Sequence, residues 1–128
     1  MKKSLVPAES KWADQVGYSR AVRAGPHIWV AGTVAVDALG SAVGTGDAYE
    51  QALHILKIVE QALARVGANM SDVVRTRVYL RDWSAKDGAT RAHREVFAQV
   101  RPAATFVLAG LVEDVFLVEI EAEAFVME

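Results

Sequence analysis

The segment 115–125 reads Val-Phe-Leu-Val-Glu-Ile-Glu-Ala-Glu-Ala-Phe and alternates between two sets of side chains. The apolar set is Phe116, Val118, Ile120, Ala122 and Ala124, and the other set is Leu117, Glu119, Glu121, Glu123 and Phe125. Successive side chains of a strand point to opposite faces, so this pattern predicts a strand with one face toward a core. The other face carries a row of carboxylates that repel one another, and it therefore needs positive charge from a neighbour.

A row of positive charge occurs in segment 73–81. Val74, Thr76, Val78 and Leu80 share one face of this predicted strand, whereas Arg75, Arg77, Tyr79 and Arg81 share the other. We expect the arginine row to lie beside the glutamate row on one sheet face, either within a subunit or across an interface. Exposed ion pairs contribute only about 0.2–1 kcal/mol each, so such pairing fixes strand register more than stability.

Two helices are predicted between the strands. Apolar residues recur at helical spacing across 47–66, with Asp47 as a candidate N-cap and Gly67 at the position of a left-handed C-cap. A second helix is predicted over 86–100, preceded by Ser84 as a candidate N-cap. Pro102 disfavours helical backbone at the residue before it and predicts a strand over 101–107.

The first third of the chain predicts a β-hairpin. Segments 18–24 and 27–33 are rich in strand-forming residues and flank the turn dipeptide Gly25-Pro26. We expect residues 1–16 to be irregular and 34–46 to be mostly loop, with at most one short strand. The order hairpin, helix, strand, helix and two strands predicts an α+β fold, a two-layer sandwich with two helices on one face of a mixed sheet. The uncovered face mixes charged and apolar side chains, which suggests oligomerisation with closed symmetry.

Composition narrows the class of protein. The 128 residues predict a single domain spanning 1–128, with 52% hydrophobic residues and a net charge of −2. This charge gives no basic surface for nucleic acid. The chain has no cysteine and its three histidines lack metal-ligand spacing, so we expect no metal site.

The sequence also suggests a cellular location. The basic start Met1-Lys2-Lys3 is not followed by an apolar run, so we expect no signal peptide. No stretch approaches the roughly 20 apolar residues of a membrane span. Together with the absence of cysteine, this predicts a cytoplasmic protein with no membrane partner.

Four stretches together resemble one known family. They are Gly-Tyr-Ser-Arg-Ala-Val at 17–22, Ile-Trp-Val-Ala-Gly-Thr at 28–33, Ser-Asp-Val-Val-Arg-Thr-Arg-Val-Tyr-Leu-Arg-Asp at 71–82, and Val-Glu-Ile-Glu-Ala at 118–122. In this order they resemble the RidA/YjgF family of reactive intermediate deaminases, also called L-PSP endoribonucleases. The resemblance implies a chorismate-mutase-like subunit and a homotrimer, in which the sheets form a central barrel and small molecules bind in clefts between subunits.

The resemblance also implies an activity and its residues. Active members hydrolyse reactive enamines and imines to a keto acid and ammonia, without a metal or organic cofactor. The family residues that line the cleft correspond here to Tyr18, Gly32 and Glu119, and the glutamate is held to position or activate the hydrolytic water. The positions of three other cleft residues, a glutamine, an asparagine and an aromatic residue, fall at Thr33, Thr90 and His93.

One departure from the family pattern limits this expectation. Active deaminases carry Pro-Ala-Arg-Ser, whose arginine grips the substrate carboxylate, whereas this chain has Pro102-Ala103-Ala104-Thr105. With Ala104 at the arginine position, we do not expect an efficient 2-imino acid deaminase. The substrate then lacks a carboxylate or places it against another cation, such as Arg101.

Several alternatives stay open from the sequence. Glu119 is either the water-activating carboxylate or a structural partner of a neighbouring arginine. Tyr18 is either a hydrogen-bond donor in the cleft or a packing residue, and His93 is either a base or an interface residue. The chain is accordingly a hydrolase of an imine, enamine or related compound, or a non-catalytic trimeric protein that binds or senses a small molecule. Ribonuclease activity, attributed to some family members, draws no support from charge or motif.

Overall fold

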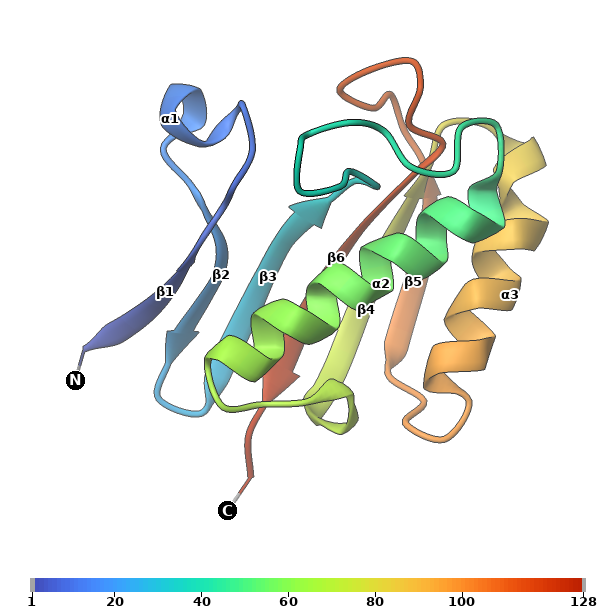
Figure 1. Cartoon of the computed structure of the whole chain (residues 1–128). Coiled ribbons are helices and arrows are strands. Elements are labelled where there is room, and N and C mark those ends of the chain that lie inside the picture. Colours follow the sequence, from blue (N-terminus) through green and yellow to red (C-terminus); the bar gives the residue numbers. More distant parts are fainter. Residues whose placement is uncertain (1, 128) are drawn as a thin grey trace.

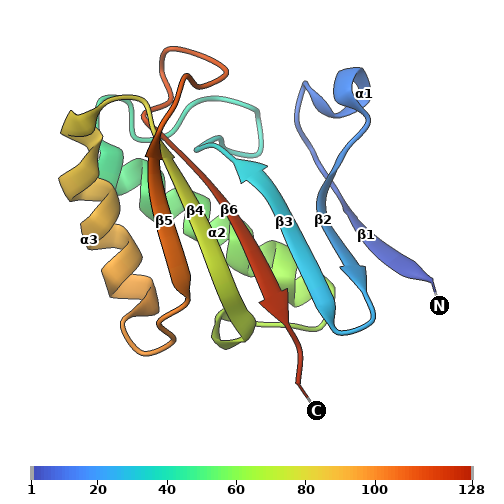
Figure 2. The same cartoon turned by 180° about the vertical axis from the view of Figure 1, so that it is seen from behind.

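The computed structural model describes residues 2–127 and contains a six-stranded sheet with two long helices on one face (Figures 1 and 2). The strand order is β1-β2-β3-β6-β4-β5. The strands are β1 (Lys3–Pro7), β2 (Ser19–Ala24), β3 (His27–Thr33), β4 (Val73–Leu80), β5 (Ala103–Leu108) and β6 (Val118–Phe125). The predicted α+β fold with a mixed sheet is confirmed.

The helices are α1 (Ala13–Val16), α2 (Ala48–Arg65) and α3 (Lys86–Phe97), with short 3₁₀ turns η1 (Met70–Asp72) and η2 (Trp83–Ala85). The ends of α2 are as predicted, because the Asp47 carboxylate accepts the Glu50 N–H at 3.0 Å and Gly67 has a φ of +80°. The expectation for Ser84 is wrong. Its N–H donates to Asp82, which caps η2, and α3 begins after that turn without a side-chain cap.

The charged rows of β4 and β6 meet within one chain. The two strands pair antiparallel, with Arg77 opposite Glu121 and Tyr79 opposite Glu119. Arg77 Nη1 lies 3.1 Å from Glu123 Oε2 and 3.5 Å from Glu121 Oε1. Of the two arrangements that the sequence left open, the one within a subunit is therefore found.

The strands β5 and β6 are consecutive in the chain, yet they lie on opposite sides of β4. β5 pairs parallel with β4, whereas β6 pairs antiparallel with it. β6 begins at Val118, later than predicted, although the preceding Phe116 is already buried. This arrangement places β6 in the middle of the sheet and β5 at one edge (Figure 2).

The expectation that residues 1–16 are irregular is wrong. Lys3–Pro7 forms the edge strand β1 and pairs antiparallel with β2, and α1 follows it. Only Val6 of β1 is buried, so the strand is held by main-chain pairing and leaves no apolar alternation in the sequence. We call residues 3–18 the N-terminal arm. In the loop 34–46, the only strand-like feature is a bridge between Val36 and Ala42.

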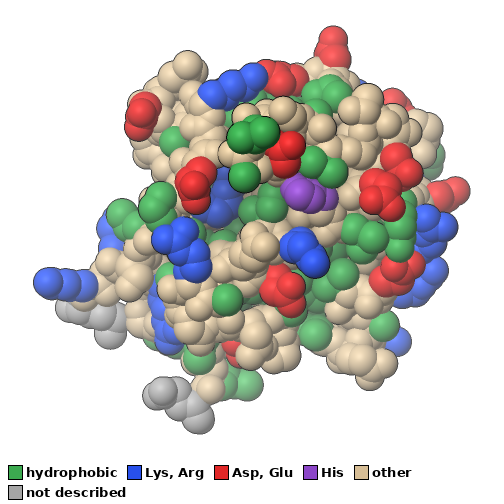
Figure 3. Space-filling model, viewed as in Figure 1, with side chains coloured by type: hydrophobic (Ala, Val, Ile, Leu, Met, Phe, Trp, Pro, Cys, Tyr) green, Lys and Arg blue, Asp and Glu red, His purple; other side chains and the backbone are tan. Residues whose placement is uncertain are grey.

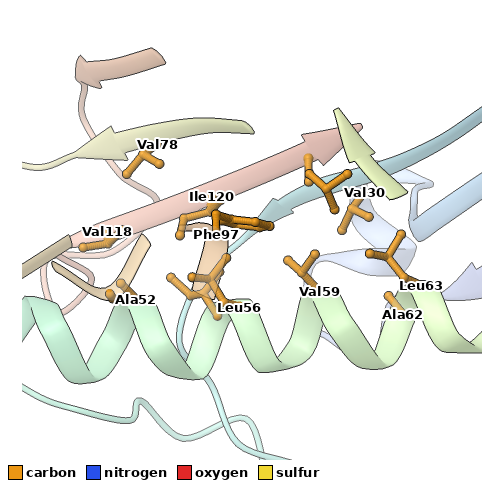
Figure 4. Close-up of a cluster of buried hydrophobic side chains, with 14 of the residues drawn as sticks. Val30, Ala52, Leu56, Val59, Ala62, Leu63, Val78, Phe97, Val118 and Ile120 are labelled. Carbon is orange, nitrogen blue, oxygen red and sulfur yellow. The ribbon is translucent and has the colours of Figure 1, made fainter. Parts of the chain in front are cut away.

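The core lies between the sheet and the helices. Figure 4 shows side chains of α2, among them Leu56, Val59 and Leu63, directed toward Val118, Ile120 and Val30 of the sheet. Phe97 of α3 joins this cluster and is 2% exposed. The alternation of β6 is confirmed, because all four of its helix-facing residues are buried: Val118, Ile120, Ala122 and Ala124.

On the face that α2 covers, acidic and basic side chains are interspersed (Figure 3). No helix within residues 2–127 has the length and apolar character needed to cross a membrane.

The buried side chain of Gln51 joins α2 to two loops. Its amide nitrogen donates to the carbonyls of Gly44 and Val115 at 3.2 and 3.0 Å, and its oxygen accepts the Leu117 N–H at 2.8 Å. Gln51 is completely shielded from solvent. These bonds fix the start of β6, the strand that carries Glu119.

We expect Gln51→Met to lower the free energy of unfolding by at least about 2 kcal/mol, because it leaves buried backbone groups without partners. Urea denaturation measures this difference. Gln99→Met is the matched control, since Gln99 is exposed and its replacement should change stability little. Equal stability of the two variants would contradict the role assigned to Gln51.

Candidate functional site

A cavity of about 760 Å³ lies where the N-terminal arm separates from the rest of the sheet. β2 and β3 pair from Ala24 and His27 as far as Ala21 and Val30. Beyond that point the two strands diverge, and residues from both of them line the cavity. Its wall is completed by the arm, α2 and loop 36–38. The polar and charged lining residues are Glu9, Ser10, Tyr18, Arg20, Thr33, Asp37, His54, Lys57, Gln61, Arg65 and Glu119.

Glu119 projects from the outer face of β6 toward Gly32 of β3. A Cβ atom at position 32 would collide with Glu119 Oε2, so glycine lets the carboxylate lie in this position and any larger residue would displace it. The register of β3 and β6 is irregular between Val30 and Thr33, which brings Gly32 under the carboxylate. The glycine and the glutamate thus form one local unit of the cavity wall.

The environment of Glu119 favours its protonated form. Burial raises the pKa of the Glu119 carboxyl, the neighbouring Glu121 raises it further, and Arg20 opposes the shift. Among residues 2–127 Glu119 makes no ion pair, unlike Glu121 and Glu123, which both contact Arg77. A carboxyl whose pKa is shifted toward neutrality suits proton transfer.

Arg20 of β2 is the cation whose charge lowers the pKa of the Glu119 carboxyl. Its Nη1 donates to the carbonyl of Gly32 and to Thr33 Oγ1, each at 2.9 Å, and its Nη2 donates to the Tyr18 hydroxyl at 3.1 Å. The guanidinium also lies over the Tyr18 ring, 5.4 Å from its centroid. These contacts hold the half-buried Arg20 in one orientation at the cavity wall.

Four of the residues predicted from the sequence meet in this cavity, namely Tyr18, Gly32, Thr33 and Glu119. The Tyr18 hydroxyl lies 2.7 Å from Ser10 Oγ and accepts from Arg20, so it is part of a polar network. Thr33 is buried, and its hydroxyl donates to the Ala31 carbonyl at 2.8 Å. Its role in the structure is to support Arg20.

The other three predicted residues lie apart from the cavity, on α3 and the edge strand β5. Ala104 is exposed and pairs with Thr76, whose hydroxyl lies 2.8 Å from His93 Nε2. His93 also packs against Phe97 and Phe106, and burial lowers the pKa of its imidazole. Thr90 precedes it on α3, on the same edge of the molecule.

Arg101 is also distant from the cavity. It is exposed in the turn before β5, with a φ of +55°. Within one chain, therefore, the cavity is lined by the cations Arg20, Lys57 and Arg65 and not by Arg101.

Sequence reasoning missed Arg20 and the N-terminal arm. Arg20 follows the predicted Tyr18 by two residues, so in a strand both side chains point to the same face, and this spacing was a usable signal. Trp12 and Val16 of the arm also line the cavity. Their stretch has no apolar period, so no pattern in it indicated that these residues line a cavity. Within the described part of the chain, no three His, Asp or Glu side chains are grouped to hold a metal ion.

The sequence matches the family model for endoribonuclease L-PSP over residues 9–126. The chain belongs to this family. It is 30% identical to the 3-aminoacrylate deaminase RutC of Acinetobacter baylyi over 126 residues. This match covers 98% of this chain and 100% of that protein. The uncharacterized protein SCO2049 of Streptomyces coelicolor is 38% identical over 94% of this chain and 90% of its own length.

Solved structures of the family agree with the fold. The crystal structure of Rv2704 from Mycobacterium tuberculosis, described as a member of the YjgF/YER057c/UK114 family, superimposes with a TM-score of 0.87. It shares 37% sequence identity and covers 98% of this chain and 100% of that one. The family membership predicted from the four sequence stretches is confirmed.

The environment of Glu119 generates a prediction about stability and pH. An acid whose pKa is higher in the folded chain binds its proton more tightly there, so its contribution to stability decreases as the pH rises. We therefore expect Glu119→Gln to raise the free energy of unfolding at neutral pH. This gain in stability should disappear below about pH 4.3, the ordinary pKa of glutamate.

Glu121→Gln is the matched control, because Glu121 accepts from the Tyr79 hydroxyl at 2.6 Å and contacts Arg77. This second variant should be less stable than the native chain at neutral pH. Urea unfolding across a pH series measures both differences. A Glu119→Gln protein that is destabilised at neutral pH would show that Glu119 is a structural ion-pair partner.

Proposed function

We propose that this protein hydrolyses a small enamine, imine or related compound and releases ammonia, with Glu119 as the residue that activates water. The observation that carries the proposal is the environment of Glu119, a half-buried carboxylate without an ion-pair partner among the described residues, placed against Gly32 in a cavity. Full-length similarity to a 3-aminoacrylate deaminase supports the reaction class.

The chemistry needs one group that moves protons in both directions. An enamine first becomes the imine by gaining a proton on its β-carbon and losing one from nitrogen. Water then adds to the carbon of the C=N bond while Glu119 takes a proton from the water, and the electrons of the C=N bond move to nitrogen. Glu119 then returns the proton to nitrogen. Glu119 next carries the hydroxyl proton to the amino nitrogen, so that the C–N bond breaks with its electron pair leaving on ammonia, and the oxygen forms the carbonyl group of the product. A carboxyl with a raised pKa serves well as both base and acid in these steps.

We also propose that the chain assembles as a homotrimer through the outer face of its sheet. Trp29 is 45% exposed there, and the acidic row is partly neutralised by Arg77, so the face suits burial against another copy. Assembly would also explain why the predicted site residues fall into two groups. A cleft between subunits would join Thr90, His93 and Ala104 of one chain to Tyr18, Gly32, Thr33 and Glu119 of the next.

The trimer can be tested by light scattering coupled to size-exclusion chromatography. We expect a mass three times the 13.9 kDa of one chain, unchanged on dilution through the micromolar range. Trp29→Glu should shift the mass toward the monomer, whereas Trp83→Glu, at an exposed position of η2, should not. A monomeric native protein would refute this part of the proposal.

The hydrolase proposal is tested with Glu119→Gln. Enamine and imine substrates, 3-aminoacrylate and 2-iminobutyrate, are generated enzymatically in the assay, and ammonia release is followed. We expect Glu119→Gln to lose at least about 100-fold of the rate of the native protein, the usual contribution of a general acid–base. Glu123→Gln is the control, because Glu123 lies on the same strand face but contacts Arg77 outside the cavity.

The missing family arginine limits the substrate range. Since Ala104 offers no guanidinium at the family position, 2-iminobutyrate, a short substrate, should be hydrolysed more slowly than by a relative that carries the arginine there. Equal rates would refute this reasoning.

The same observation favours a second candidate function. A chain that has lost the carboxylate clamp and kept the scaffold can bind or sense a small molecule without turning it over. A metabolite screen by thermal shift, followed by a turnover assay of each hit, distinguishes the two functions. Binding without turnover by native protein and Glu119→Gln alike would establish the binding protein.

A further inference from the structure

We propose that Arg20 is the anion-binding residue of this cavity, and that the cavity takes a carboxylate ligand with a bulky apolar body. This inference deepens the proposed function and rests on the same cavity, but it concerns binding and is tested without turnover. It assigns the binding of the ligand carboxylate to a residue of β2, because Ala104 has no charged group that could bind it.

The hydrogen bonds of Arg20 leave it able to bind a ligand. A guanidinium has five N–H donors. Three donors are used by Gly32, Thr33 and Tyr18, so Nε and one N–H of Nη2 stay available. No ion pair to Arg20 occurs among residues 2–127, although the side chain is half-buried. A partly desolvated cation with free donors at a cavity wall is suited to a carboxylate.

The other cations of the lining are placed less favourably. Lys57 and Arg65 extend from α2 and are exposed to solvent, so water and salt screen their charges. Arg20 is also held by contacts to a carbonyl, a hydroxyl and an aromatic ring, and little side-chain freedom is lost when it binds an anion. We therefore assign the carboxylate to Arg20 rather than to the rim of the cavity.

The size and lining of the cavity define the rest of the ligand. Its volume of about 760 Å³ falls in the range of pockets for drug-sized molecules, roughly 300–1,000 Å³, and is large for a three-carbon imino acid. Apolar side chains from separate elements face it: Val6 of β1, Trp12 and Val16 of the arm, Ile58 of α2 and Val112. An aromatic or branched aliphatic body would displace water from this wall.

The charges of the wall also place the two ends of such a ligand. Arg20 and Glu119 both contact Gly32, Arg20 at the carbonyl oxygen and Glu119 at the Cα side. A carboxylate bound by Arg20 would therefore bring the neighbouring part of the ligand beside Glu119. The amine or imine group of the substrate belongs at that end, and the apolar body extends toward the arm.

The experiment compares 3-phenylpropionate with its neutral amide, 3-phenylpropanamide, as probes in isothermal titration. We expect the native protein to bind the carboxylate at least tenfold more tightly than the amide. Arg20→Gln should abolish this preference while it keeps the affinity for the amide, which shows that the cavity is still formed. Lys57→Gln should reduce the preference by no more than about threefold, as expected for a rim charge.

Four results would overturn the inference. The first two concern the native protein: it does not bind 3-phenylpropionate, or it binds the acid and the amide equally tightly. The other two concern the variants: Arg20→Gln still prefers the acid, or Lys57→Gln loses the preference for the acid as fully as Arg20→Gln does. Acetate that binds as tightly as 3-phenylpropionate would overturn the apolar part. Arg20-dependent binding without ammonia release from any imine would leave this inference standing and remove only the hydrolase. Hydrolysis of an imine without Arg20-dependent binding would support the hydrolase and overturn the assignment of Arg20.

Discussion

The central constraint in this molecule is the alternation of β6, because it fixes both the core and the site. Its inner face packs on α2, so the outer face must carry Glu119, Glu121 and Glu123. The flanking strands then treat the three carboxylates differently. On the β4 side, Glu121 contacts Arg77 and Tyr79, and Glu123 contacts Arg77. On the β3 side, Glu119 lies against Gly32, which has no side chain. Of the three glutamates, two are therefore paired with Arg77, and Glu119 has no ion pair among the described residues.

The sequence predicted those parts of the fold that have a local period or a charge pattern. The helix α2 has a continuous apolar stripe between Asp47 and Gly67, and both ends are found as expected. The register of β4 and β6 follows from opposite charges, which leave few alternatives once one face is buried. By contrast, β1 buries a single side chain, so nothing in its sequence distinguishes it from a loop.

The candidate site was predictable only in part, for a related reason. Tyr18, Gly32 and Glu119 could be found because they lie in stretches that resemble a family. The cavity itself depends on where β2 and β3 stop pairing and on an arm packed beside α2, and neither has a sequence signature. Long-range geometry of this kind also decides which lining arginine is half-buried and which is exposed.

Arg20 and Glu119 carry opposite charges beside the same glycine, and what keeps them apart matters for any chemistry at the site. A direct ion pair would stabilise the ionised carboxylate and lower the pKa of Glu119, which would make it a poor proton carrier. The Gly32 carbonyl, the Thr33 hydroxyl and the Tyr18 hydroxyl accept from the guanidinium and hold it against β3, and it makes no ion pair with Glu119 there. Thr33 and Tyr18 line the cavity, and both of their hydroxyls accept a hydrogen bond from Arg20. Under the proposed function, both hydroxyls would orient Arg20 for a substrate that carries an anionic and a nitrogen-bearing group.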